Sequence, residues 1–159
     1  MEPKIVPLTD ASGAMAVELA HRYEAEWFPY YGPEGPGDAA ADMATYRSDD
    51  GLPRCLVALD AASHFLGTAA LKSDSLGAEI APGPWLAALL VAPERRGQGV
   101  GRALVAAVEA EARRLGYSAL YASTDSARSI LIRRGWARIG ETGSLRGPIE
   151  VFRIGLDGS

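Results

Sequence analysis

Apolar residues recur at helical spacing in several stretches of the chain. In residues 12–27 they lie four positions apart along one stripe, which is the pattern of an amphipathic helix. These residues are Met15, Leu19, Tyr23 and Trp27. A second helix is predicted after Asp38, a suitable N-cap residue. Segment 32–37, rich in glycine and proline, separates the two helices because it favours no regular structure.

Two further helices are predicted in the second half of the chain. Residues 99–115 carry an inward apolar face and end at Gly116, in the manner of a C′ glycine. That face consists of Val100, Leu104, Val108 and Leu115. A last helix is expected to begin at Asp125, acting as N-cap, and to stop at Gly135.

The remaining apolar runs have the length and composition of strands. A hairpin is predicted from residues 55–60 and 65–72, which flank a short polar turn. Residues 85–91, WLAALLV, form a continuous apolar run suited to the middle of a sheet covered on both faces. Shorter strands are expected at 4–8, 118–123, 136–140 and 149–156. The resulting order, β-α-α-β-β-β-α-β-α-β-β, predicts an α/β fold with a mixed sheet around one core.

Composition narrows the class of protein. The 159 residues are 48% hydrophobic and 23% charged, so we expect a single domain spanning residues 1–159. The net charge of −4 argues against nucleic-acid binding, which needs a concentrated basic surface. Cys55 is the only cysteine, which excludes a disulfide within the chain and a thiolate metal cluster. Residues 1–10 lack the apolar run of a signal peptide, and we expect a cytoplasmic protein with no membrane segment and no metal.

Residues 89–102, LLVAPERRGQGVGR, carry the most chemical information. Three glycines alternate at positions 97, 99 and 101, between the end of a buried strand and the start of a helix. Glycines there let several backbone N–H groups converge on an anion, and the helix dipole adds to the attraction. The pattern predicts a phosphate or pyrophosphate site flanked by Arg95, Arg96 and Arg102.

Two common nucleotide-binding motifs do not fit this segment. The Walker loop needs a lysine after its last glycine, and none follows here. The dinucleotide motif needs glycines at G-x-G-x-x-G, whereas this spacing is G-x-G-x-G with Arg102 next. The predicted anion site therefore belongs to neither of these two motif classes.

Residues 96–101, RGQGVG, match position for position the motif Q/R-x-x-G-x-G/A that follows a strand, and LLVAP at 89–93 is similar to its lead-in. At these residues the chain resembles the GNAT superfamily of N-acetyltransferases. The resemblance covers most of the chain and is most specific over 85–136. It implies a GNAT-like acyl-CoA N-acyltransferase fold, with a central mixed β-sheet, about four flanking helices and strands splayed at the CoA site.

The resemblance implies acetyl-CoA as the cosubstrate. Amides of the glycine-rich turn would hold the pyrophosphate, and backbone groups of the splayed strand would pair with the pantetheine. Arginines beside the turn would add positive charge. The expected cofactor-binding residues are Leu89, Leu90, Val91, Arg96, Gly97, Gln98, Gly99, Val100, Gly101 and Arg102.

Catalytic residues are less well defined. Acetyl transfer to an amine needs a general base, and a proton donor helps the thiolate to leave. The resemblance implies a tyrosine donor four residues before the Gly135-Trp136 step, but Leu131 stands there and donates no proton. The alternatives are another donor, protonation by solvent, or lost activity. Weak candidates are Tyr121 and Ser129 as donors and Glu79 and Glu26 as bases, with ordinary surface roles as the competing interpretation for the two carboxylates.

Aromatic residues indicate where an acceptor would bind. Trp27, Tyr30 and Trp85 are expected to line a pocket between the early helices and the motif strand. Their rings can contact the apolar body of an amine or its cation, with core packing as the alternative role.

Three functions follow from these observations. The first is an acetyl-CoA-dependent N-acetyltransferase, monomer or homodimer, that acts on a small-molecule or peptide amine by direct attack in a ternary complex. The second is a catalytically degenerate acyl-CoA sensor, consistent with Leu131. The third is an interaction protein whose glycine-rich turn binds no cofactor.

Overall fold

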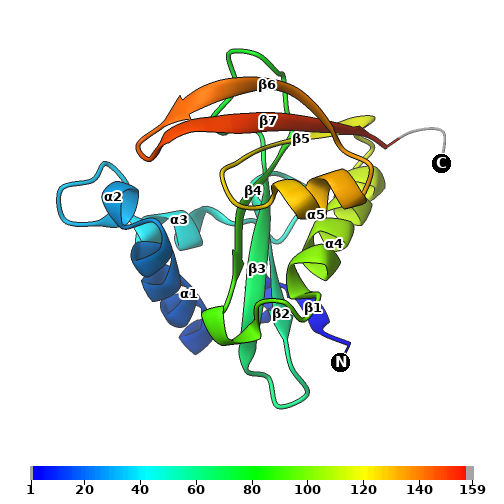
Figure 1. The fold of residues 1–159 in the computed structure, drawn as a ribbon. Coiled ribbons are helices and arrows are strands. Elements are labelled where there is room, and N and C mark those ends of the chain that lie inside the picture. The colour runs from blue at the N-terminus through cyan, green and yellow to red at the C-terminus, as the bar shows by residue number, and fades with distance from the viewer. Residues whose placement is uncertain (1, 157–159) are drawn as a thin grey trace.

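The computed structural model describes residues 2–156, which form a seven-stranded sheet with five helices (Figure 1). The strands are β1 (Lys4–Pro7), β2 (Arg54–Leu59), β3 (Phe65–Lys72), β4 (Trp85–Val91), β5 (Ala119–Thr124), β6 (Ala137–Ser144) and β7 (Gly147–Gly155). The helices are α1 (Gly13–Glu26), α2 (Phe28–Tyr31), α3 (Ala39–Thr45), α4 (Val100–Arg114) and α5 (Arg128–Arg133). No helix among these is long and apolar enough to cross a membrane.

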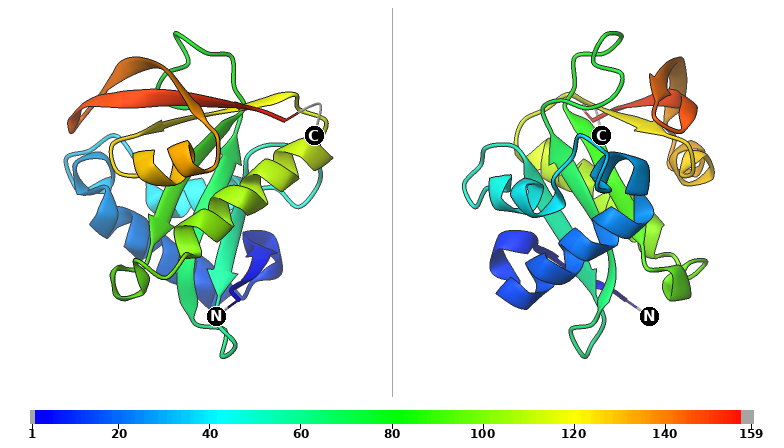
Figure 2. Two further views of the ribbon diagram at one scale, coloured as in Figure 1. Left: turned by 45° about the vertical axis from the view of Figure 1, so that its right-hand side comes forward. Right: turned by 90° about the vertical axis from the view of Figure 1, so that its left-hand side faces the viewer.

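The sheet has the order β1-β2-β3-β4-β5-β7-β6 and is antiparallel except between β4 and β5. Helices α1 to α3 cover one face, and α4 and α5 cover the other (Figures 1 and 2). Each face has its own core, with Leu19 and Tyr23 fully buried in the first and Leu104 and Leu131 in the second. The predicted mixed α/β fold is confirmed, with five helices instead of about four because α2 adds a turn after α1.

Local sequence explains where two of the helices begin. The predicted N-cap Asp38 accepts a hydrogen bond from a backbone N–H in the first turn of α3, and Ser12 does the same for α1. The expectation that Asp125 caps the following helix is wrong. The hydroxyl of Thr124 accepts two backbone N–H groups instead, and α5 begins only at Arg128.

Strands β4 and β5 pair only near the start of β4. Trp85 lies opposite Tyr121 and Leu86 opposite Ala122, and no later pair joins the two strands within residues 2–156. Strand β4 also bulges against β3, with Ala88 at a left-handed φ of 53°. A bulge bends its strand, and this conformation is unfavourable for a residue with a Cβ. Beyond Leu86, the edge of β4 that faces β5 therefore has no strand partner.

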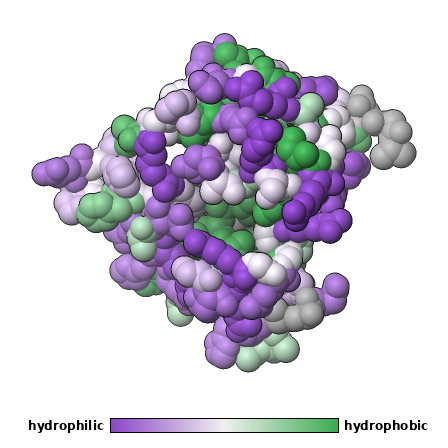
Figure 3. Space-filling view, viewed as in Figure 1, coloured by the Kyte–Doolittle hydropathy of each residue, from purple (hydrophilic) through white to green (hydrophobic). Residues whose placement is uncertain are grey.

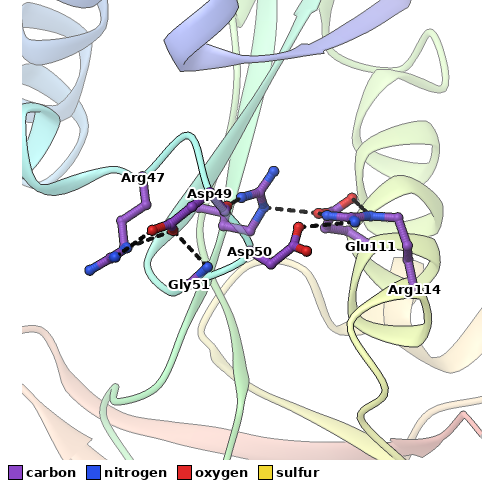
Figure 4. Close-up of polar contacts among 7 residues, drawn as sticks. Arg47, Asp49, Asp50, Gly51, Glu111 and Arg114 are labelled. Atoms are coloured by element: carbon purple, nitrogen blue, oxygen red, sulfur yellow. Dashed lines mark hydrogen bonds and ion pairs between the residues drawn. The ribbon is translucent and has the colours of Figure 1, made fainter.

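The loop after α3 is fixed to α4 by ion pairs (Figure 4). Arg54, which is buried, places Nε 2.8 Å from a carboxylate oxygen of Glu111, and Arg114 binds both Glu111 and Asp50. The hydrogen bonds from Arg114, followed by the charges of Arg114 and Arg54, lower the pKa of Glu111. These contacts hold the C-terminal half of α4 against the α3–β2 loop.

Candidate functional site

The separation of β4 from β5 opens into a cavity of about 850 Å³, here called the central cavity. Its lining comes from both faces of the sheet, because Trp27 and Tyr31 belong to the α1–α3 side and Leu131 to the α5 side. In the space-filling view, apolar residues form the floor of a recess near the middle of the molecule, below the β6–β7 hairpin (Figure 3). The cavity thus passes through the sheet where the two strands part.

The glycine-rich turn follows directly after β4. Gly97 and Gly99 have left-handed φ values of 79° and 86°, and no atom lies within 4 Å of the position that a Cβ would take on either. Gly99 is the N-cap of α4 and no side chain caps the helix, so the N–H groups of its first turn are available to an anion. Gly101 has a different role, since its Cβ would stand 2.9 Å from the Cδ1 of Ile130 in α5. The first two glycines suit an anion site, and the third allows α4 and α5 to pack closely.

The other residues expected to bind the cofactor lie around this turn and along β4. Gln98 and Arg102 are exposed, the latter in the first turn of α4, whereas the Val100 side chain is buried in the core. Leu89 lines the central cavity. Leu90 and Val91 pair with β3 through one edge of β4 and leave the other edge unpaired.

The Arg96 guanidinium makes two hydrogen bonds within the protein. Its Nε donates to the backbone oxygen of Val91 at 3.2 Å, and its Nη2 donates to the Glu26 carboxylate at 3.0 Å. The guanidinium thus joins the end of β4 to the last residue of α1. An anion that binds Arg96 would have to share it with Glu26.

The structure does not bring the catalytic candidates together at the cavity. Glu79 is exposed and accepts a hydrogen bond from Thr142 on β6, and Glu26 is paired with Arg96. Neither Ser129, which is exposed, nor Tyr121 belongs to the lining of the central cavity.

Leu131 lies at the position where the family resemblance implies a tyrosine donor. It is fully buried in α5 and lines the cavity, but it has no polar atom in its side chain. The Tyr121 ring packs against Trp85, with centroids 5.7 Å apart. This placement does not support Tyr121 as a substitute donor.

Two of the three aromatic residues expected at the acceptor pocket line the central cavity. These are Trp27 and Tyr30. Trp85 is fully buried against Tyr121 and Val151, outside the cavity lining, so its placement supports a packing role.

Sequence reasoning did not single out Asp42 and Lys72, two charged residues of the cavity lining, or the contact of Asp42 with Tyr31. The Tyr31 hydroxyl donates to the Asp42 carboxylate at 2.5 Å, which ties α2 to α3. Burial first, and then this hydrogen bond, raise the pKa of Tyr31 well above its ordinary value, so the hydroxyl stays protonated. The pair could not be read from sequence, because only the turn through segment 32–37 brings the two helices together.

Comparison with known proteins agrees with this geometry. Residues 18–133 match the family model described as Acetyltransferase (GNAT) family. No functionally curated protein matches the chain.

Solved structures share the fold at low sequence identity. An aminoglycoside 6′-N-acetyltransferase complexed with coenzyme A aligns over 98% of both chains, with a TM-score of 0.77 and 15% identity. A phosphinothricin acetyltransferase from Sinorhizobium meliloti in complex with AcCoA has a TM-score of 0.75 and 19% identity, over 98% of this chain and 89% of that one. A GCN5-related N-acetyltransferase from Kribbella flavida has a TM-score of 0.73 and 20% identity, over 97% and 98%. Because the family model also covers most of its length, this chain belongs to the GNAT acetyltransferase family.

Proposed function

We propose that this protein transfers the acetyl group of acetyl-CoA to the amine of a small molecule or peptide, by direct attack in a ternary complex. The observation that carries the proposal is the central cavity, which opens where β4 and β5 part. Residues of β4 line it, and the glycine-rich turn follows at the end of the same strand. One strand therefore connects an anion site to a chamber of the size that small ligands occupy.

The residues around β4 fit the chemical groups of acetyl-CoA. The open space before Gly97 and Gly99 and the uncapped N–H groups of α4 suit a pyrophosphate. The unpaired edge of β4 suits an extended amide-containing chain such as pantetheine, which would bind as an added strand. When bound, acetyl-CoA supplies an activated thioester.

In the proposed reaction the acceptor nitrogen bonds to the carbonyl carbon as the carbon–sulfur bond breaks. The nitrogen loses one proton to a carboxylate or to water in the cavity, and the thiolate leaves and is protonated by solvent. A backbone N–H on the free edge of β4 is suited to polarise the carbonyl.

Direct attack is favoured because the cavity lining contains no cysteine or histidine within residues 2–156. Its serines and threonines therefore have no imidazole to activate them. Cys55 lies in the core under α1, where its thiol contacts the Thr68 hydroxyl at 3.2 Å. Burial raises the pKa of Cys55 to about 11, so it is a thiol near neutral pH.

Steady-state kinetics test this proposal. Thiol release from acetyl-CoA is followed over a panel of amines while both substrates are varied. Intersecting reciprocal plots are expected for a ternary complex, whereas parallel plots would indicate an acetyl-enzyme and overturn the direct mechanism. Calorimetric titration with CoA tests the cofactor site separately.

A second candidate function is a sensor that binds acyl-CoA without turnover. The observation in its favour is Leu131, an apolar side chain at the cavity wall where the family resemblance implies a donor. Tight acetyl-CoA binding without acetylation of any amine in the panel would favour this function.

A further inference from the structure

We propose that the acceptor is a zwitterion of the amino-acid type, with its ammonium group at Asp42 and its carboxylate at Lys72. This inference rests on the proposed function and specifies the acceptor. It follows from two side chains of opposite charge that line the central cavity and have no oppositely charged side chain within 4 Å among residues 2–156.

Asp42 has a hydrogen-bond donor beside it and no countercharge in contact with it over residues 2–156. The protonated Tyr31 hydroxyl donates to it at 2.5 Å, and a neutral donor stabilises a carboxylate without neutralising it. No basic side chain in the described part of the chain lies within 4 Å of Asp42. Trp27 and Tyr30 line the same cavity. A carboxylate with aromatic rings nearby suits an ammonium group, which gains both ion-pair and cation–π contacts.

Lys72 supplies the opposite charge. It is the last residue of β3, half-buried, and among residues 2–156 no carboxylate approaches its ammonium group within 4 Å. A partly buried charge without a partner is unfavourable. A ligand anion would relieve that cost.

Two further acidic side chains and one arginine line the cavity, and of these only Asp125 and Arg146 form an ion pair within the part of the chain that the structure describes. Arg146 pairs with Asp125 at 3.6 Å, and Asp74 is exposed and accepts a backbone N–H in its loop. The phosphates of CoA are also unsuited to Lys72. It pairs with Trp85 at the start of β4, whereas the glycine-rich turn follows the other end of that strand, about 20 Å away at the rise of an extended chain.

The cavity mouth indicates the kind of side chain that the acceptor carries. Tyr30, Leu76 and Leu145 line the cavity and are 44%, 50% and 65% exposed, respectively. Apolar surface at a mouth favours an apolar substituent, so amino acids with apolar side chains are the first acceptors to test.

The experiment compares amino acids with apolar side chains and their carboxamides, which keep the amine and lose the carboxylate. Acetylation is measured by thiol release, and binding is measured by calorimetry with CoA present. The variants are Lys72→Met and, as the matched control, Lys4→Met, because the exposed Lys4 on β1 is the only other lysine in the chain.

The native protein is expected to prefer an amino acid over its carboxamide by about tenfold or more, the effect of one charge-assisted hydrogen bond. Lys72→Met should remove that preference while carboxamide binding stays within about twofold, and Lys4→Met should change neither. Asp42→Asn should weaken binding of both ligands, because both carry the ammonium.

Three outcomes would overturn the inference: equal use of amino acid and carboxamide, an equal loss for both in Lys72→Met, or no binding of any amino acid. Amino-acid binding that depends on Lys72, without acetylation, would instead contradict the proposed enzymatic function and leave the ligand class supported.

Discussion

Glu26, the last residue of α1, is ion-paired at 3.0 Å with Arg96, which lies seventy positions later in the turn after β4. The pair is partly exposed, so its contribution to folding is small, at most about 1 kcal/mol. Its effect on an anion bound at the turn is electrostatic repulsion. Glu26 places a negative charge beside the cation that would attract the anion.

Glu26→Gln is therefore expected to tighten CoA binding by about two- to fivefold at low salt, by removing repulsion and freeing Arg96. The gain should shrink in high salt, where exposed charges are screened. Calorimetry at two salt concentrations measures both effects. Arg96→Ala provides the opposite comparison and should weaken binding by about 1–2 kcal/mol. A large loss of turnover in Glu26→Gln with unchanged CoA affinity would identify Glu26 as the general base.

Gly99→Asp should abolish CoA binding, because a carboxylate would occupy the open space before the helix and repel the pyrophosphate. Gly99→Asn is the matched control, since asparagine has the same shape and also tolerates left-handed backbone. It should weaken binding by less, and both variants should melt at similar temperatures. Equal CoA affinities for the two variants would exclude charge repulsion as the cause.

Gly101→Asp is a poor test, because its side chain would collide with Ile130 and disturb the fold.

Leu131→Tyr should raise acetyl transfer, since it places a hydroxyl on the wall of the central cavity. General acid catalysis is worth about 10²–10⁴-fold, and overpacking of this buried site will offset part of that gain. Leu131→Phe has the same bulk without the hydroxyl and serves as the control. Tyr121→Phe should leave the rate unchanged, because Tyr121 lies outside the cavity lining. A Leu131→Tyr rate equal to that of Leu131→Phe would show that the thiolate leaves unassisted.

Glu111 gives the fold a pH dependence. Its pKa is lower in the folded protein than the ordinary value of about 4.3, so its stabilisation is fully present above that pH and is lost as the pH falls through the folded value. Glu111→Gln should lower the free energy of unfolding by about 1–2 kcal/mol at pH 7. The difference between the two proteins should narrow below pH 4. Urea unfolding at several pH values measures the free energy of unfolding of both proteins. A difference between them that does not change with pH would show that Glu111 stabilises the fold by packing and not by its charge.

The sequence predicted elements whose signals are local. The apolar run over 85–91 is observed as β4 (Trp85–Val91), and Asp38 caps α3 as its position suggested. The prediction for Asp125 failed because a turn precedes α5: the Thr124 hydroxyl accepts the N–H groups of Ser126 and Ala127, and no side chain caps the helix. Local pattern alone does not reveal this turn.

The acceptor side of the cavity depends on contacts between distant segments. Tyr31 meets Asp42 only because a glycine-rich loop folds α3 back beside α2, and Lys72 reaches the cavity only because β3 lies beside β4. Trp85 and Trp27 are both expected from the sequence at the acceptor pocket. The alternation of side chains along β4 instead places Trp85 in the core, where its ring packs against Tyr121. Periodicity does not report which face of a central strand meets the cavity.

The gap between β4 and β5 also changes how the sheet meets other chains. A strand edge on the outer surface invites pairing with another molecule, but the free edge of β4 lies along a recessed cavity of about 850 Å³. Only a slender extended ligand can complete its hydrogen bonds. We therefore expect amide protons on that edge to exchange readily in the free protein and slowly once such a ligand is bound. The fold keeps an unpaired strand edge inside a recess, where it can select a ligand without promoting aggregation.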